Sequence, residues 1–135
     1  MRNLFIITIF SLATLASAQR PEEIATAVVQ HQLEAYNAKD IDAFMDVFSE
    51  NAAIYNFGKT DAIAKGTKEI RAVYFNLFKN SPNLHSLVIN RSVIGNKVID
   101  YELISGRQGY DETLKFIAIY EIENGLIQKA TFIRE

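Results

Sequence analysis

Two stretches in the second half of the chain decide the fold: LHSLVINRSVIGNKVIDYELIS at residues 84–105 and ETLKFIAIYEIENGLIQKATFIRE at residues 112–135. In both stretches, apolar and polar residues alternate with the period of two that is typical of β-strands. Each stretch is interrupted once by a two-residue turn signal, Gly95-Asn96 in the first and Asn124-Gly125 in the second. The pattern therefore predicts two long antiparallel hairpins in succession.

The two turns also predict which side chains face each other across each hairpin. The Gly95-Asn96 turn places Arg91 opposite Asp100, either as an ordinary cross-strand ion pair or as part of a polar cluster inside the fold. The Asn124-Gly125 turn places Lys115 beside Arg134, which indicates an exposed face or, alternatively, an anion site. The second hairpin is apolar on both faces, so its sequence leaves open which face of residues 113–134 lines a pocket. We expect one face to cover the helices and the other to meet a partner subunit or, alternatively, another layer of the fold.

The segment before the hairpins is helical at its start. Residues 21–40, PEEIATAVVQHQLEAYNAKD, repeat apolar residues with a helical period, and Pro21 is well placed to open the helix. Gln32 falls in the middle of the apolar arc of this helix, where a polar side chain is unexpected.

Two further helices and a short strand follow. Asp40 is a plausible N-cap for a short helix whose apolar face would run as far as Phe48. Residues 52–57 then read as a short strand, and a third helix is expected from Gly66 to the Ser-Pro-Asn stop at residues 81–83. Three helices followed by a mainly antiparallel sheet make an α+β fold. A curved sheet wrapped around these helices would leave a conical hollow, where we expect a ligand to sit.

The N-terminus has the composition of an export signal. Residues 1–18 contain one charge, Arg2, then an uncharged apolar run, and end in Ala16-Ser17-Ala18. We interpret residues 1–18 as a cleaved signal peptide and residues 19–135 as one mature domain, located in the periplasm or outside the cell. No membrane anchor would remain after cleavage, whereas an uncleaved anchor is the alternative interpretation.

Composition excludes several classes of function. The formal net charge is −2, which argues against a nucleic-acid partner. The chain has no Cys, so disulfides, iron–sulfur sites and thiol nucleophiles are excluded, and its two His cannot form a three-His metal site. The sequence contains no phosphate-binding loop or dinucleotide fingerprint. We therefore expect no metal and no cofactor.

The order of these elements resembles a known superfamily. The resemblance rests on three segments: AYNAKDIDAFMDVFSENAAIYNF at residues 35–57, GTKEIRAVYFNLF at residues 66–78 and YEIENGLIQKATFIRE at residues 120–135. Together they resemble the nuclear-transport-factor-2-like superfamily, in its SnoaL-like and ketosteroid-isomerase-like branch. The resemblance implies a cone-shaped α+β fold, a mostly apolar pocket and frequent homodimers. It does not imply one reaction, because this fold serves many functions.

The residues that a ketosteroid isomerase needs are not found at the matching positions. The resemblance implies a general-base Asp at the end of the first strand, and an oxyanion hole made by a Tyr and a protonated Asp. Here Asn56, or alternatively Tyr55, stands at the base position, Gln32 at the Tyr position, and Ala118 near the position of the protonated acid. Since Asn cannot abstract a proton from carbon, we expect no steroid-isomerase mechanism.

Polar residues that could line the hollow are the remaining candidates. Gln32 and Asn56 are expected to contact a ligand, although a buried structural amide and a turn residue are the respective alternatives. Among the tyrosines, Tyr36 and Tyr120 are expected to point inward. The weaker candidates for a catalytic base are Asp100 and His85.

Three functions follow from this sequence. The first is an exported protein that binds a small, largely apolar molecule without converting it. The second is an enzyme of the isomerase, lyase or hydrolase type that uses Asp100 or His85 as its base. The third is a dimeric interaction module whose cone is filled by its own side chains.

Overall fold

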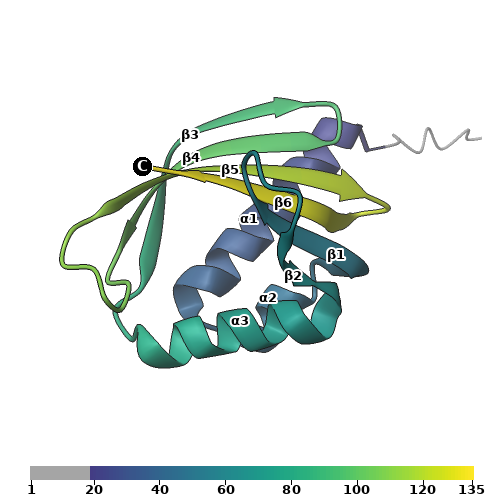
Figure 1. Ribbon diagram of the computed structural model, residues 1–135. Helices are drawn as coiled ribbons and strands as arrows, with labels where there is room; N and C mark the ends of the chain where they lie inside the picture. The colour runs from purple at the N-terminus through teal and green to yellow at the C-terminus, as the bar shows by residue number, and fades with distance from the viewer. Residues whose placement is uncertain (1–18) are drawn as a thin grey trace, which may run out of the picture.

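The computed structural model describes residues 19–135, so the predicted signal peptide at residues 1–18 lies outside the described residues. Figure 1 shows the elements in chain order. Their bounds are α1 Pro21–Ala38, α2 Ile41–Met45, β1 Phe48–Asn56, β2 Ala62–Lys65, α3 Gly66–Asn80, β3 His85–Ile94, β4 Lys97–Ser105, β5 Leu114–Glu123 and β6 Leu126–Arg134. The predicted α+β class is confirmed.

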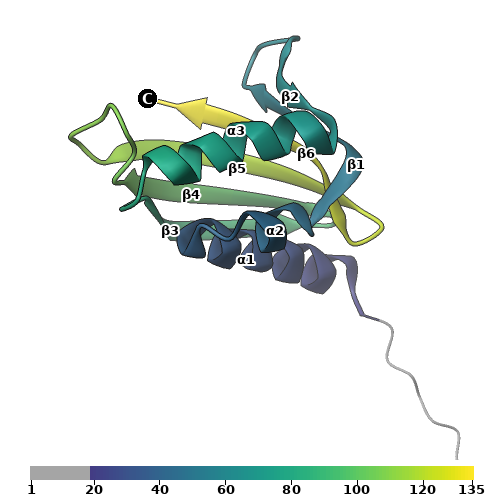
Figure 2. The same ribbon diagram turned by 90° about the horizontal axis from the view of Figure 1, so that it is seen from below.

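The strands form one six-stranded sheet in the order β2-β1-β6-β5-β4-β3. The sheet curves around the helices, and all three helices lie on its concave face (Figures 1 and 2). The neighbouring strands pair antiparallel except β1 and β6, which pair in parallel. This parallel pair connects the first half of the chain to the last strand and was not predicted.

An aromatic cluster joins the three helices beneath the sheet. The rings of Phe44 and Tyr74 lie 4.3 Å apart between centroids, and Tyr36 meets Phe78 edge-on at 5.6 Å. All four side chains are buried. Such pairs stabilise the core beyond the burial of their area and fix the position of α3 relative to α1.

The predicted helices are largely confirmed, but the segment around Phe48 is different. The short helix ends at Met45, and Phe48 is the first residue of β1 instead of the last apolar residue of a helix. Its spacing from Phe44 fits a helix, yet both rings reach the same cluster with centroids 5.0 Å apart. The strand β2 (Ala62–Lys65) was not predicted because four residues are too few to show an alternation.

The two hairpins keep their predicted turns but differ in register. Arg91 faces Asp100 across β3 and β4, as predicted. In the second hairpin the register shifts between Glu121 and Ile122, so that Arg134 faces Phe116 instead of Lys115. The predicted Lys115–Arg134 neighbourhood is therefore wrong, because a β-bulge inserts one extra residue and turns each later side chain to the other face.

The two faces of β5 have separate environments. Phe116, Ala118 and Tyr120 are buried toward the helices, whereas Ile117 on the other face is 36% exposed. The face of β5 that carries Phe116 and Tyr120 is therefore the one that lines the pocket, a choice that the sequence left open. The homodimer expected to cover the outer face stays a prediction. None of the helices in residues 19–135 has both the length and the apolar character needed to span a membrane.

Candidate functional site

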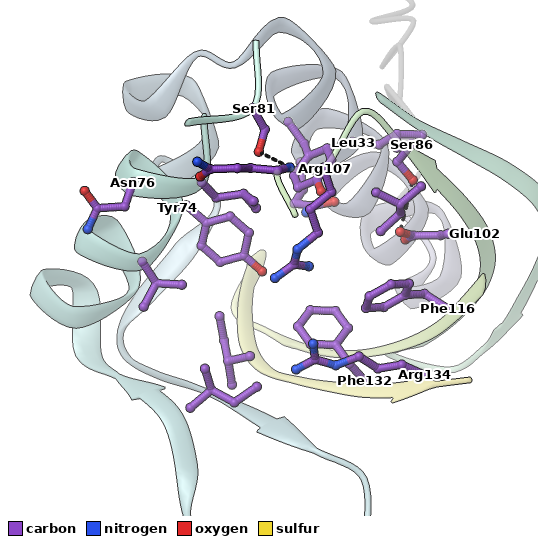
Figure 3. Close-up of a pocket in the computed structure, with 18 of the residues that line it drawn as sticks. Leu33, Tyr74, Asn76, Ser81, Ser86, Glu102, Arg107, Phe116, Phe132 and Arg134 are labelled. Carbon is purple, nitrogen blue, oxygen red and sulfur yellow. Dashed lines mark hydrogen bonds between the residues drawn. The ribbon is translucent and has the colours of Figure 1, made fainter. Parts of the chain in front are cut away.

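A cavity of about 340 Å³ lies between the helices and the concave face of the sheet. Figure 3 shows side chains from α1, α3 and strands β4 to β6 converging on it. Most of its wall is apolar, and Leu77, Ile104, Phe116 and Phe132 contribute large side chains. The volume falls in the range of sites that hold a small organic molecule.

Three of the predicted ligand-binding residues line this cavity, namely Gln32, Tyr36 and Tyr120. Gln32 is 5% exposed and belongs to α1, where the helical period places it among buried residues. Tyr36 lies one turn further along the same helix, and Tyr120 comes from the centre of β5. The three residues therefore reach the cavity from two elements, α1 and β5.

Several polar groups line the cavity and face its open space. Across residues 19–135, no fully buried side-chain nitrogen or oxygen lacks a partner. The Gln32 amide and the hydroxyls of Tyr36 and Tyr74 form no side-chain hydrogen bond in these residues, so they open onto the cavity. Burial raises the pKa of both tyrosines, so both hydroxyls stay protonated and can donate a hydrogen bond. The alternative in which Gln32 binds a strand backbone group is not seen. The cavity therefore offers donors and acceptors to a guest molecule.

The carboxyl group of the cavity is Glu102, from β4. It is 7% exposed and is held by two neutral donors: Ser86 Oγ lies 3.0 Å from Oε2, and the Tyr120 hydroxyl lies 3.4 Å from Oε1. Burial raises the pKa of Glu102 from 4.5 to about 7, and the nearby charge of Asp100 acts in the same direction. Glu102 can therefore exchange a proton near neutral pH.

The strand that carries Ser86 is tied directly to helix α1. The Asn37 side chain donates to the Ser86 carbonyl at 3.0 Å and accepts from the Ser86 amide at 2.8 Å. This pair of bonds fixes the Ser86 hydroxyl relative to Glu102. No role was predicted for Asn37 or Ser86, because the contact between these two residues exists only in the folded chain.

Asp100 lies two residues before Glu102 on the same face of β4 and is 1% exposed. Its two oxygens accept from Arg91 Nε at 2.7 Å and from the same guanidinium at 2.8 Å, and Arg91 also donates to Gln30 at 3.0 Å. Within residues 19–135, Asp100 is not among the residues that line the cavity. Its carboxylate is occupied by the guanidinium, which favours a structural role over that of a base.

The other two candidates also lie away from the cavity wall. Asn56 ends β1 and accepts a hydrogen bond from Arg134 at 3.1 Å. His85 begins β3, is exposed and borders a shallow depression next to Asn37 and Arg91. The described cavity lining contains neither residue.

Two arginines complete the wall, Arg107 from the β4–β5 loop and Arg134 from β6. The sequence did not single out Arg107, and it offered Arg134 only together with Lys115 as an alternative anion site. Figure 3 shows both guanidinium groups directed toward the hollow. No local sequence signal marks Arg107. The bulge in the second hairpin is what brings Arg134 to the inner face, since the unshifted register would have turned it outward.

The sequence of this chain matches a known protein family. The chain belongs to the SnoaL-like domain family, whose match covers residues 29–130. No sequence among the curated proteins is detectably similar to it.

Solved structures show the same fold at low sequence identity. An uncharacterized cystatin-fold protein from Novosphingobium aromaticivorans superposes with a TM-score of 0.74 and 21% identity, over 82% of this chain and 97% of that one. A protein assigned as a ketosteroid isomerase from Kribbella flavida gives 0.74 and 16%, over 87% and 82%. A protein assigned as a SnoaL-like polyketide cyclase from Jannaschia gives 0.74 and 14%, over 88% and 90%. At these identities the likeness concerns the fold alone.

Proposed function

We propose that this protein binds a small, largely apolar molecule in the cavity between its helices and sheet. One observation carries the proposal: an apolar cavity of about 340 Å³ is lined by the polar groups of Gln32, Tyr36 and Tyr74, which form no side-chain hydrogen bond within residues 19–135 and open onto the cavity space. Because no fully buried polar side-chain atom within residues 19–135 lacks a partner, the groups that open onto the cavity are the ones available to a guest molecule. The cavity also argues against a cone filled by its own side chains. If residues 1–18 are a signal peptide, binding takes place after export.

Binding of a neutral apolar dye tests this proposal. N-phenyl-1-naphthylamine fluoresces on entering an apolar site, and we expect the purified full-length chain to bind one molecule. Val73→Trp places a large ring at the partly exposed wall of the cavity, so it should weaken dye binding by about tenfold or more. Phe75→Trp is the matched control, because Phe75 is exposed on the same helix and is not part of the cavity wall. Equal binding by both variants would place the dye elsewhere and refute the proposal.

Gln32→Leu separates a ligand contact from a structural amide. As a contact, Gln32 should matter for guests that can hydrogen-bond, while the fold stays intact. As a structural amide, its loss should instead lower the free energy of unfolding by about 1–3 kcal/mol. Urea unfolding and dye displacement on the same variant distinguish the two roles.

A second candidate function is proton transfer to or from the bound molecule. It is favoured by Glu102, which lies in the cavity wall with its pKa raised to about 7. In this role Glu102 replaces Asp100 and His85 as the candidate base. Deuterium exchange at the acidic carbon of 2-tetralone, followed by NMR, measures this activity. The original chain should accelerate exchange and Glu102→Gln should not; equal rates would exclude the role.

A further inference from the structure

We propose that the cavity selects ligands that carry a carboxylate group, and that Arg107 and Arg134 bind this group at the cavity mouth. This inference rests on the proposed binding function and specifies its ligand class: an apolar body with one anionic end.

Arg107 is held in place by its loop. Gly106 has φ +71° and approaches so closely that a Cβ there would lie 2.1 Å from the Asn83 carbonyl oxygen. Next along the chain, the Gln108 amide donates to the buried Ser81 Oγ at 3.0 Å. The loop is therefore docked on both sides of Arg107, against the segment that follows α3. The Arg107 side chain is half-buried and projects into the hollow (Figure 3).

Arg134 reaches the same space from the sheet. Its guanidinium donates to Asn56 Oδ1 at 3.1 Å and lies 5.8 Å from the centre of the Phe116 ring, which belongs to the cavity wall. The adjacent carboxylate, Glu135, does not neutralise it, since Glu135 forms its ion pair with Lys115 at 3.0 Å. The Asn56 contact leaves further donors of the guanidinium available to a ligand.

The two charges are uncompensated within the protein. Among the ion pairs formed in residues 19–135, none includes Arg107 or Arg134, although other surface and buried arginines are paired with carboxylates. The guanidinium of Arg107 does contact one ring, that of Tyr110, at 5.9 Å. Both guanidinium groups beside the apolar cavity therefore remain available to an anionic ligand. Guanidinium groups are well suited to carboxylates because they offer several donors in a fixed plane.

Both charges act on the cavity itself. Burial raises the pKa of Tyr36 and Tyr74, whereas the positive charge of Arg107 acts to lower both. The charge of Arg134 also acts to lower the pKa of Tyr74. A carboxylate held between the arginines would leave the apolar body of the ligand against Phe116 and Phe132. The anionic end would thus remain at the mouth, with the body inside.

A matched pair of probes tests this selection. 1-Naphthylacetic acid and 1-naphthylacetamide have nearly the same shape, and only the acid is charged at pH 6. Calorimetry on the full-length chain should show that the acid binds about tenfold more tightly than the amide. The double variant Arg107→Gln/Arg134→Gln should bring the affinity ratio close to one. Arg71→Gln is the matched charge control, since Arg71 is exposed, pairs with Asp42 and is outside the cavity wall.

Using the ratio of acid to amide separates loss of the anion site from loss of the fold, because a damaged cavity would weaken both probes. A ratio near one in the original chain, or a ratio unchanged in the double variant, overturns the inference. If the neutral dye binds while the ratio is one, only the anion selection fails. If neither the dye nor either probe binds, the proposed binding function fails, and the inference fails with it. A ratio that falls equally in Arg71→Gln would reflect overall charge only and would also overturn it.

Discussion

Asp100 and Glu102 are two buried carboxyl groups on the same face of β4, yet their surroundings differ completely. Asp100 receives two hydrogen bonds from the Arg91 guanidinium, at 2.7 and 2.8 Å. Glu102 is bound only by neutral donors, Ser86 and Tyr120, and forms part of the cavity wall. A charge-assisted bidentate pair occupies both oxygens of Asp100, whereas burial raises the pKa of Glu102.

This comparison shows that burial alone does not identify a carboxyl group that can transfer protons. Asp100 is the more deeply buried of the two, but its oxygens are already occupied. Burial is the largest cause of the rise in the pKa of Glu102 to about 7, although the hydrogen bonds from Ser86 and Tyr120 act in the opposite direction. Removing a partner from either group should therefore have consequences of different kind and size.

The largest effect is expected from Arg91→Ala. The substitution leaves the Asp100 carboxylate buried without its cation, which should lower the free energy of unfolding by about 3–5 kcal/mol. Urea denaturation measures this loss. Arg71→Ala is the control, because it breaks an exposed ion pair and should cost at most about 1 kcal/mol. Similar losses in both variants would contradict the structural role given to the Arg91–Asp100 pair.

A smaller, pH-dependent effect is expected from Glu102→Gln. Because the pKa of Glu102 is about 7 in the folded protein and 4.5 in its ordinary range, the folded chain binds more protons between these values. The free energy of unfolding should fall as pH rises through this window, by about 3 kcal/mol from Glu102 alone, and should change no further above pH 7. The difference between the stability curves of the original chain and Glu102→Gln isolates this contribution. Parallel curves would show that the pKa is not raised.

The smallest effects concern the two neutral donors. Ser86→Ala and Tyr120→Phe each remove a hydrogen bond that favours the ionised form of Glu102, so each should raise its pKa further. We expect the larger rise for Ser86→Ala, because its bond is 3.0 Å long against 3.4 Å for Tyr120. NMR titration of the Glu102 carboxyl carbon measures both shifts. A fall in pKa for either variant would mean that the donor does not stabilise the carboxylate.

Much of the fold could be predicted because its signals are local. The helical period of residues 21–38 and the two turn signals are properties of neighbouring residues, and the structure confirms them. Gln32 was recognised as buried by the same argument, from its place on one helix face. The strand β2 and the early end of the second helix were not predicted, because short elements contain too few residues to show a period.

The cavity wall was predicted less well. Gln32, Tyr36 and Tyr120 belong to long elements with a clear inner face, and they do line the cavity. Arg107 lies in a loop whose position depends on the close approach of Gly106 to Asn83, and Arg134 depends on a bulge that no turn signal announces. Both arginines therefore required the tertiary structure.

Periodicity and turn signals were enough to predict the long helices, the two hairpin turns, the facing of Arg91 and Asp100, and the burial of Gln32, since each depends on residues a few positions apart. Only the tertiary structure decided that Glu102 meets Ser86 and Tyr120, that Arg134 turns inward, and that a cavity remains between helices and sheet. The physical reason is that contacts between distant segments set the local charge and burial. The chemistry of a carboxyl group depends on those two quantities.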